Sequence, residues 1–245
     1  MIHRIISPKH CLHFISRTQK FVAIFFILFL TYGLIDGLFI APPDYQQGNI
    51  YRIMYIHVPF AILSLSVYVM MSFCALIYLI WKIKIADLIA KISAPIGAVF
   101  TALTLITGSI WGRFTWGTYW IWDARLTSEL ILLFIYVGII AIRSAMPEQR
   151  LASYASGIVT LLGLINIPII HYSVDWWNTL HQGPSILKFG SPSIAPSMLH
   201  PLLAMIVASF LSYTLVVMRR LTDELDVLPN QTTGPDLLLT KRAHE

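Results

Sequence analysis

The sequence predicts an all-α integral membrane protein with six transmembrane helices, and three observations support this fold class. First, 57% of the 245 residues are hydrophobic and only 12% are charged, whereas a soluble domain has about 25% charged residues. Second, six apolar runs approach or exceed the roughly 20 residues that a helix needs to cross a hydrocarbon core of about 30 Å. Third, the basic residues are distributed very unevenly among the segments between these runs.

The six apolar runs form one expected membrane domain, residues 21–218, between an N-terminal segment, residues 1–20, and a polar tail, residues 219–245. The first run continues to Ile40 without a small-residue cleavage motif, so we expect a retained span rather than a signal peptide. A tryptophan-rich segment, residues 111–128, lies between the third and fourth runs and completes these shorter ones in part. The expected spans are residues 21–40, 53–80, 93–110, 126–142, 151–170 and 197–218.

The basic residues predict the orientation of the chain. With six spans both termini lie on one side of the membrane, and that side holds all but four of the 17 Lys and Arg residues. Basic residues collect on the cytoplasmic side, so we expect cytoplasmic termini and, in a bacterium, periplasmic loops on the other side. The net charge of +5 then reflects topology, and we expect no nucleic-acid partner. The outer side keeps Arg52, Arg113, Arg125 and Lys188.

Tryptophan concentrates on the outer side, where all of the 7 Trp residues except Trp81 fall. An interfacial belt of Trp and Tyr is common in membrane proteins, but a belt occupies both interfaces. The asymmetry therefore favours a surface for a large planar apolar ligand, bound by stacking and burial of area, with a belt as the alternative. The tryptophan-rich segment contributes Trp111, Trp116, Trp120 and Trp122.

Two outer histidines are candidates for metal ligands. His57 lies at the outer end of the second span and His181 in the third outer loop, so they can approach a metal from two sides. Imidazole is a usual axial ligand of haem iron, and the outer loops offer no cysteine for a zinc site. His171 and His200 lie near helix ends, where we expect structural roles. The 2 cysteines form no Cys-x-x-Cys-His motif, so the chain is not itself a c-type cytochrome.

The charged residues of the outer side have two possible interpretations. Asp123 precedes the fourth span, where a side-chain oxygen can cap the helix, and Arg125 can pair with Glu129 at i, i+4. Alternatively, Arg52 and Arg125 bind haem propionates, because arginine binds carboxylates through two parallel hydrogen bonds. Both interpretations stay open from the sequence.

Residues 116–123 read W-G-T-Y-W-I-W-D. This pattern resembles the tryptophan-rich WWD signature of haem-handling proteins in cytochrome c biogenesis. Together with YRIMYIHVP around His57 and HYSVDWWNTLHQG around His181, it is similar to the CcmC family of the cytochrome c maturation system. The resemblance runs from about residue 41 to residue 183.

The resemblance implies a haem-handling membrane protein without catalytic activity of its own. Haem b would be a transient cargo, presented at the periplasmic face of a bacterial inner membrane and loaded onto the haem chaperone CcmE. The small protein CcmD and the ATP-driven CcmA–CcmB pair would be further partners in the lipid bilayer. In the implied site, His57 and His181 are axial ligands of the haem iron. The other implied site residues are the haem platform, Trp111, Trp116, Trp120, Trp122 and Asp123, and the cations for propionates or the chaperone, Arg52 and Arg125.

Three alternatives remain. A haem translocator with a pathway through the helices would have charges within its spans, and the sequence offers few, with Asp36 and Glu129 near the outer edges. A membrane oxidoreductase subunit with structural b haem would have histidines deep in the spans, whereas here they lie at the outer ends. In a purely structural subunit, the tryptophans would only anchor the chain in the membrane.

Overall fold

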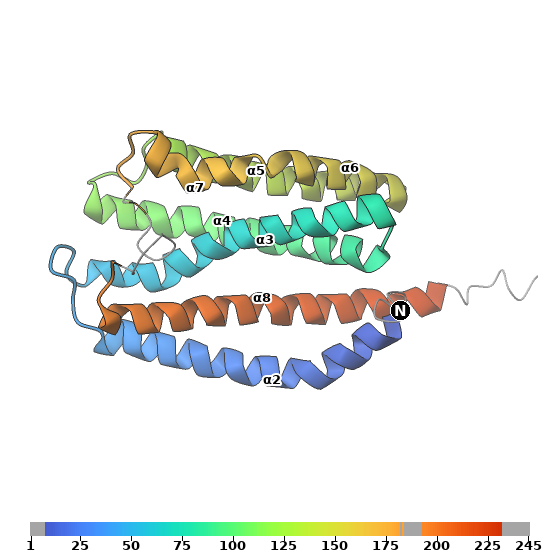
Figure 1. Cartoon of the computed structure of the whole chain (residues 1–245), viewed down its shortest axis with the longest axis horizontal. Coiled ribbons are helices and arrows are strands. Elements are labelled where there is room, and N and C mark those ends of the chain that lie inside the picture. Colours follow the sequence, from blue (N-terminus) through green and yellow to red (C-terminus); the bar gives the residue numbers. More distant parts are fainter. Residues whose placement is uncertain (1–7, 182, 184–192, 232–245) are drawn as a thin grey trace, which may run out of the picture.

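The fold is a bundle of long helices that lie side by side along one axis (Figure 1). The structure, a computed structural model, describes residues 8–181, 183 and 193–231. Within them, six helical segments are long and apolar enough to cross a membrane, and no strand occurs, so the predicted fold class is confirmed. The elements are Pro8–Ile35 (α2), the π-helix Asp36–Ile40 (η1), the 3₁₀-helix Ile50–Ile53 (η2), Met54–Trp81 (α3), Lys84–Thr115 (α4), Ala124–Ala145 (α5), Gln149–Gly163 (α6), Asn166–Trp176 (α7) and Pro196–Gln231 (α8).

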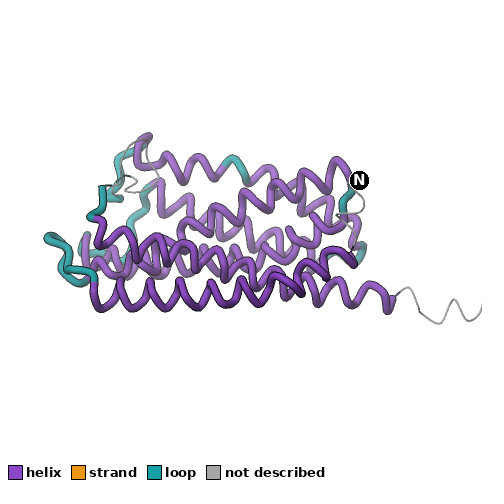
Figure 2. The backbone as a smooth tube through the Cα atoms, turned by 60° about the horizontal axis from the view of Figure 1, so that its bottom comes forward, coloured by secondary structure: helices purple, strands orange, loops and turns teal. Residues whose placement is uncertain are grey.

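Most helices pack on their neighbours in sequence, with the most extensive contact between α3 and α4. The exception is α2, which packs on the last helix, α8. Helix α8 in turn contacts α3 and α4, and α5 contacts α4, α6 and α7. Both ends of the described chain lie at the same end of the bundle (Figure 1). We call this the inner end and the opposite one the outer end. The longest loops gather at the outer end, where Figure 2 shows most of the non-helical chain.

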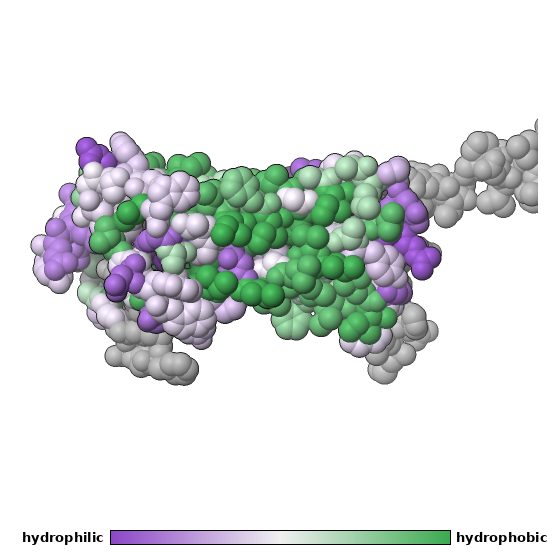
Figure 3. All heavy atoms as spheres, turned by 90° about the horizontal axis from the view of Figure 1, so that it is seen from above, coloured by the Kyte–Doolittle hydropathy of each residue, from purple (hydrophilic) through white to green (hydrophobic). Residues whose placement is uncertain are grey.

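The side of the bundle is apolar midway between its inner and outer ends. Figure 3 shows a broad hydrophobic band across the face formed by α5, α6 and α7, with hydrophilic residues at both ends. Large apolar side chains such as Phe134 and Leu162 are 65% and 63% exposed on these helices. Contiguous apolar surface of this extent marks contact with a membrane or a partner, and here it matches the band expected of a transmembrane bundle.

Two buried tyrosines form the centre of the core. The rings of Tyr68 in α3 and Tyr136 in α5 meet edge to face, with centroids 5.2 Å apart. A buried tyrosine hydroxyl needs a hydrogen-bond partner: that of Tyr68 donates to the carbonyl of Thr160 at 3.0 Å, and that of Tyr136 to the carbonyl of Ser64 at 2.8 Å. A Cβ atom on Gly97 would lie 2.3 Å from the Tyr136 ring. Glycine at this position therefore lets α4 approach α5.

The tryptophan-rich segment is part helix and part loop. Helix α4 continues past residue 110, where the third span was expected to end, so Trp111 lies in its final turns. The backbone N–H of Trp116 donates to the carbonyl of Gly112 at 2.7 Å and closes the last turn. Gly117 then adopts φ +80°, a left-handed conformation that favours glycine. The segment predicted as one platform is thus a helix end followed by an irregular loop.

The expected fifth span consists of two helices, α6 and α7, which are separated at residues 164–165. Pro168 lies in the first turn of α7 and has no N–H to donate to the preceding turn. Asn166, also in that turn, donates its side-chain N–H to the carbonyl of Ser128 at 2.9 Å. This bond attaches the start of α7 to α5, although Ile165 in the break itself is 67% exposed.

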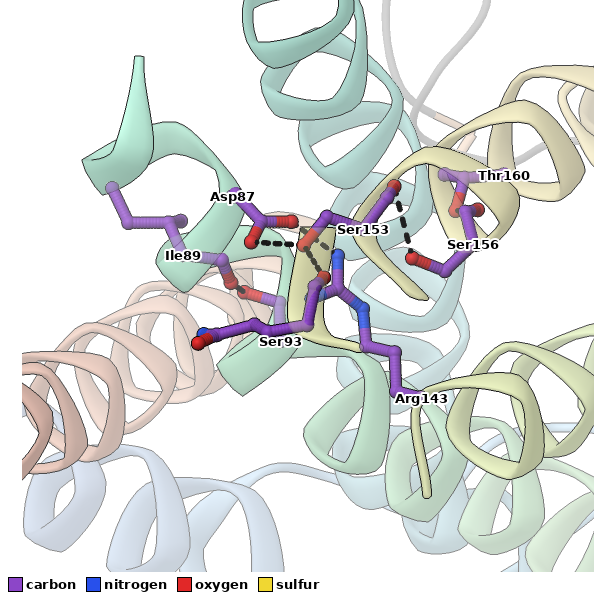
Figure 4. Close-up of polar contacts among 8 residues, drawn as sticks. Asp87, Ile89, Ser93, Arg143, Ser153, Ser156 and Thr160 are labelled. Atoms are coloured by element: carbon purple, nitrogen blue, oxygen red, sulfur yellow. Dashed lines mark hydrogen bonds and ion pairs between the residues drawn. The ribbon is translucent and has the colours of Figure 1, made fainter. Parts of the chain in front are cut away.

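A buried ion pair joins three helices at the inner end (Figure 4). Nη2 of Arg143 in α5 lies 2.5 Å from Oδ1 of Asp87 in α4, and the hydroxyl of Ser153 in α6 donates to Oδ2 of Asp87 at 2.7 Å. The side chains of Arg143 and Asp87 are 13% and 9% exposed. The third span was expected to begin at residue 93, whereas α4 begins at Lys84. Asp87 is therefore a buried charge in the first turn of this helix, before the expected start of the span.

Candidate functional site

A cavity of about 100 Å³ lies at the outer end, where the start of α3 and the end of α4 meet the loop after α7. His57 and His181, which the sequence singled out from distant segments, both line it, together with Trp111 and Trp116. The structure therefore brings four of the predicted site residues to one place. The complete lining is Gln47, His57, Gly108, Trp111, Gly112, Thr115, Trp116, Leu180 and His181.

His57 lies in the first turn of α3 with only 8% of its surface exposed. Its Nδ1 is 3.0 Å from the hydroxyl oxygen of Thr107 in α4. Its ring meets the indole of Trp111 edge to face, with centroids 5.6 Å apart and planes at 80°. A Cβ atom on Gly108 would lie 2.9 Å from Cε1 of His57. Three residues on one face of α4 thus contact this imidazole and leave little freedom for its orientation.

His181 reaches the cavity from the loop after α7, and its ring lies 5.1 Å from that of Trp116. Its Nδ1 is buried and has no hydrogen-bond partner among the described residues. The pKa of His181 is lowered to about 4, chiefly by burial and also by the positive charge of Arg125, while the carboxylate of Asp123 opposes the shift. The imidazole is therefore neutral at pH 7, which is the form that binds a metal.

Asp123 connects the loop of His181 to α5. One carboxylate oxygen accepts the backbone N–H of Leu126 at 2.8 Å, which confirms the predicted helix cap. The other oxygen accepts a hydrogen bond from the hydroxyl of Thr179, whose oxygen accepts the backbone N–H of His181 at 3.0 Å. Asp123 therefore positions the backbone of His181 through Thr179, and its contact with haem stays a prediction.

The other two tryptophans of the segment lie outside the lining of the cavity. Trp120 and Trp122 form an edge-to-face pair with centroids 5.4 Å apart, and Trp122 is 76% exposed. Nε1 of Trp120 is buried without a partner in the described part of the chain. The tryptophans thus divide into a cavity pair and a separate loop pair, and contact of the loop pair with haem stays a prediction.

A wider hollow of about 330 Å³ adjoins the cavity and shares Gln47, Thr115 and Trp116 with it. Nε1 of Trp111 donates to Oε1 of Gln47 at 2.8 Å and holds the first outer loop against α4. Small-molecule sites usually have volumes of about 300–1,000 Å³, so the cavity alone is too small to enclose a porphyrin. The remaining lining residues of the hollow are Gln46, Ile50 and Phe114.

Arg52 is bound to backbone carbonyls. Its Nη1 donates to the carbonyl of Gly37 at 2.5 Å and its Nη2 to that of Ala41 at 2.7 Å, while Nε donates to Oδ1 of Asn49 at 3.3 Å. The last carbonyls of a helix have no partner within it, and these two lie in and just after the π-helix η1. Arg52 therefore stabilises the end of η1. Propionate binding by the remaining N–H groups of Arg52 stays a prediction.

Arg125 lies in the first turn of α5. Among the described residues neither Glu129 nor any other carboxylate forms an ion pair with Arg125, so the i, i+4 pair considered from the sequence does not form. Glu129 is 7% exposed and accepts a hydrogen bond from the hydroxyl of Ser64 at 2.8 Å instead. The guanidinium is thus not neutralised by a direct carboxylate contact, and its role as a propionate partner stays a prediction.

Part of the cavity lining was not predicted from the sequence. Gly108 and Gly112 are four residues apart and so share one helix face, and a Cβ atom on Gly112 would lie 3.0 Å from the Trp116 ring. The spacing of these two glycines is the feature of the sequence that could have predicted their role. It leaves room on α4 for the ring of His57 at Gly108 and for the ring of Trp116 at Gly112. Neither His171, whose ring packs on that of its neighbour in sequence, nor the exposed His200 lines the cavity. The lining residues without a recognisable signal are Gln47, Thr115 and Leu180.

Comparison with known proteins gives consistent matches. The family model of CcmC, described as Heme exporter protein C, matches residues 1–232. Heme exporter protein C of Escherichia coli K12 is 50% identical over 219 residues, which cover 89% of this chain and 88% of that protein. The Haemophilus influenzae protein of the same name is 46% identical over 224 residues, 91% of each chain. A putative cytochrome c biosynthesis ccmC-like mitochondrial protein of Marchantia polymorpha is 47% identical over 194 residues, 79% of this chain and 82% of that one. The chain belongs to the CcmC family.

Proposed function

We propose that this protein binds haem b as a transient cargo at the periplasmic face of a bacterial inner membrane and delivers it to the haem chaperone CcmE during cytochrome c maturation. The observation that carries the proposal is the outer cavity that His57 and His181 line together with Trp111 and Trp116. Imidazoles are usual ligands of haem iron, and indole rings suit a planar apolar group. The names of the relatives, which refer to haem export and cytochrome c biosynthesis, support the same cargo.

The residues of the site have distinct parts in this function. His57 and His181 bind the iron, and Trp111 and Trp116 pack against the porphyrin, which extends into the adjoining hollow. The guanidinium of Arg125 attracts propionates. The haem supplies a vinyl group for attachment to CcmE, while the protein supplies position and charge. Because the hollow is open, one edge of the haem stays accessible to the chaperone.

The partners follow from the same role. The protein acts with CcmE, with CcmD and with the ATP-driven CcmA–CcmB pair, and it needs no catalytic activity of its own. Both histidines lie at the outer end, whereas an oxidoreductase with structural b haem would hold them deep in the bundle. The two cavities described above also lie at the outer end, which supports handling at the surface over a pathway through the helices.

Removal of either imidazole is expected to reduce the haem that copurifies with the protein. We expect His57→Ala and His181→Ala to retain less than about a tenth of the haem of the wild type, because loss of an iron ligand costs at least as much as loss of its outer partner, about 10–100-fold. Haem is measured by absorption spectroscopy of the purified protein, and delivery by the covalent haem on coexpressed CcmE.

His200→Ala is the matched control, since this histidine is exposed and lies outside the cavity. It should retain the haem and the CcmE loading of the wild type. Unchanged haem content in both His57→Ala and His181→Ala would contradict the proposed site. If the wild type contains haem but coexpressed CcmE carries no covalent haem, the proposed delivery is wrong and the proposed haem binding still stands.

A reporter fusion at Gly117 is expected to signal a periplasmic location, because basic residues collect on the opposite side of the predicted topology. A fusion at Pro147, in the turn between α5 and α6 at the inner end, is the control and should signal the cytoplasm. The measurement compares alkaline phosphatase activity, which needs the periplasm, with the fluorescence of a cytoplasmic reporter. The reverse pattern would overturn the proposed orientation and leave the fold untouched.

A further inference from the structure

The hydroxyl of Thr107 makes contacts that decide which nitrogen of His57 carries a proton. The oxygen lies 3.0 Å from Nδ1 of His57. It also lies 2.6 Å from the carbonyl oxygen of Leu103 and 3.3 Å from that of Thr104, both in the preceding turn of α4. A carbonyl accepts only, so the single hydroxyl proton has two acceptors competing for it besides the histidine.

The shortest of these contacts assigns the proton. At 2.6 Å the hydroxyl of Thr107 donates its hydrogen bond to the carbonyl of Leu103, and the hydroxyl oxygen keeps its lone pairs to accept one. Nδ1 of His57 must therefore be the donor in the 3.0 Å contact. A neutral imidazole that carries its proton on Nδ1 presents an unprotonated Nε2.

The position of the ring agrees with this assignment. From a Cβ atom built on Gly108 the distances are 2.9 Å to Cε1, 3.5 Å to Nδ1 and 3.8 Å to Nε2 of His57. Nδ1 is thus the nitrogen closer to α4, and Nε2 is the one farther from it. The ring of Trp111, on the same helix face, also meets the His57 ring edge to face, with centroids 5.6 Å apart.

We propose that Thr107 is a positioning residue, which accepts a hydrogen bond from Nδ1–H of His57 and so keeps Nε2 unprotonated and available to iron. That His57 binds iron rests on the proposed function. That His57 carries its proton on Nδ1 rests on the hydrogen-bond geometry alone. Histidines that bind metals usually donate their other N–H to such an oxygen, which fixes the tautomer and the ring orientation. Thr107 itself does not line the cavity.

The first test needs no haem. Nitrogen-15 NMR of haem-free protein with labelled histidine separates the two neutral tautomers, and the spectrum of His57→Ala identifies the signals of His57. We expect the Nδ1–H form in the wild type and in Thr107→Ser, which keeps the hydroxyl. Thr107→Val keeps the shape but removes the acceptor, and we expect the Nε2–H form to become detectable.

The second test measures haem affinity in the same variants. Loss of an outer-shell partner of a metal ligand costs about 10–100-fold in affinity, so Thr107→Val should bind haem at least about tenfold more weakly and change its absorption spectrum. Thr107→Ser should restore both. The matched control is Thr101→Val: Thr101 is fully buried on the same helix and its hydroxyl donates to the carbonyl of Gly97 at 2.8 Å, without a contact to histidine.

The outcomes separate this inference from the proposed function. The inference is overturned if the wild type shows the Nε2–H tautomer of His57. It is also overturned if Thr107→Val leaves the NMR spectrum of His57 unchanged, even when His57→Ala loses haem. Loss of haem in His57→Ala with wild-type affinity in Thr107→Val also overturns it. If His57→Ala keeps its haem, the proposed ligand is wrong, and the positioning role falls with it although the tautomer is still measured.

Discussion

Replacing Arg143 with Met is expected to lower the free energy of unfolding by about 3–5 kcal/mol, the usual cost of removing one partner of a buried ion pair. The Asp87 carboxylate would keep the Ser153 hydroxyl as a donor at 2.7 Å but would have no neutralising charge. The pair joins α4 and α5, and Ser153 adds α6 (Figure 4). The loss should therefore appear as one cooperative shift when purified protein in mild detergent is titrated with dodecyl sulfate and followed by circular dichroism.

The exposed ion pair of Lys91 and Glu224 provides the control. Its atoms lie 2.7 Å apart, but the side chains are 39% and 36% exposed, and exposed pairs contribute at most about 1 kcal/mol. Lys91→Met should therefore cost far less than Arg143→Met. The double variant Asp87→Asn with Arg143→Met should recover part of the loss, since no charge then stays buried. Equal costs for Lys91→Met and Arg143→Met would show that the buried pair has no special weight.

Replacing Gly97 with Ala is expected to destabilise the bundle by about 3 kcal/mol, near the upper end of the usual cost of overpacking. The new methyl group would lie 2.3 Å from Cε1 and Cζ of Tyr136. This tyrosine is fully buried and its hydroxyl is bound to the carbonyl of Ser64 at 2.8 Å, so the ring cannot move aside without losing that bond. The measurement is again a dodecyl sulfate titration.

Gly138→Ala is the matched control for this substitution. Gly138 lies in α5, and a Cβ atom there would have no neighbour within 4 Å. Alanine is favoured over glycine in a helix by up to about 1 kcal/mol, so this variant should be unchanged or slightly more stable. Gly97→Ala combined with Tyr136→Leu should cost less than the sum of the two single changes, because the residues are in contact. Strict additivity would contradict the proposed clash.

Much of the fold follows from properties that a sequence displays directly. Hydrophobic runs long enough to cross a membrane gave six spans, and the structure has six such helical segments. The ends were less predictable, because a helix can extend beyond the apolar stretch when its polar residues find partners. Asp87 is the main example: it precedes the apolar run, and only the contact with Arg143 and Ser153 allows it to be buried in α4.

The candidate site was predictable in composition but not in contacts. The sequence identified His57 and His181 as possible ligands because they come from different outer segments near the tryptophan-rich segment, and the structure places both in one cavity. The sequence could not show which tryptophans line the cavity and which form the separate loop pair, because that depends on where α4 ends. Nor could it show that Arg52 binds carbonyls at the end of η1, because a free carbonyl and a propionate attract the same guanidinium.

The pairing of α2 with α8 has a consequence for the order of synthesis. Helix α2 is made first and packs on α8, which is made last, and only 11% of its most apolar stretch is buried. At about 5–20 residues per second, the roughly 200 residues between the ends of the two helices take on the order of 10–40 s to translate. During that interval the first span resides in lipid without its principal partner. Its sequence must therefore be stable as a single inserted helix, which the apolar run from Phe21 to the end of α2 provides.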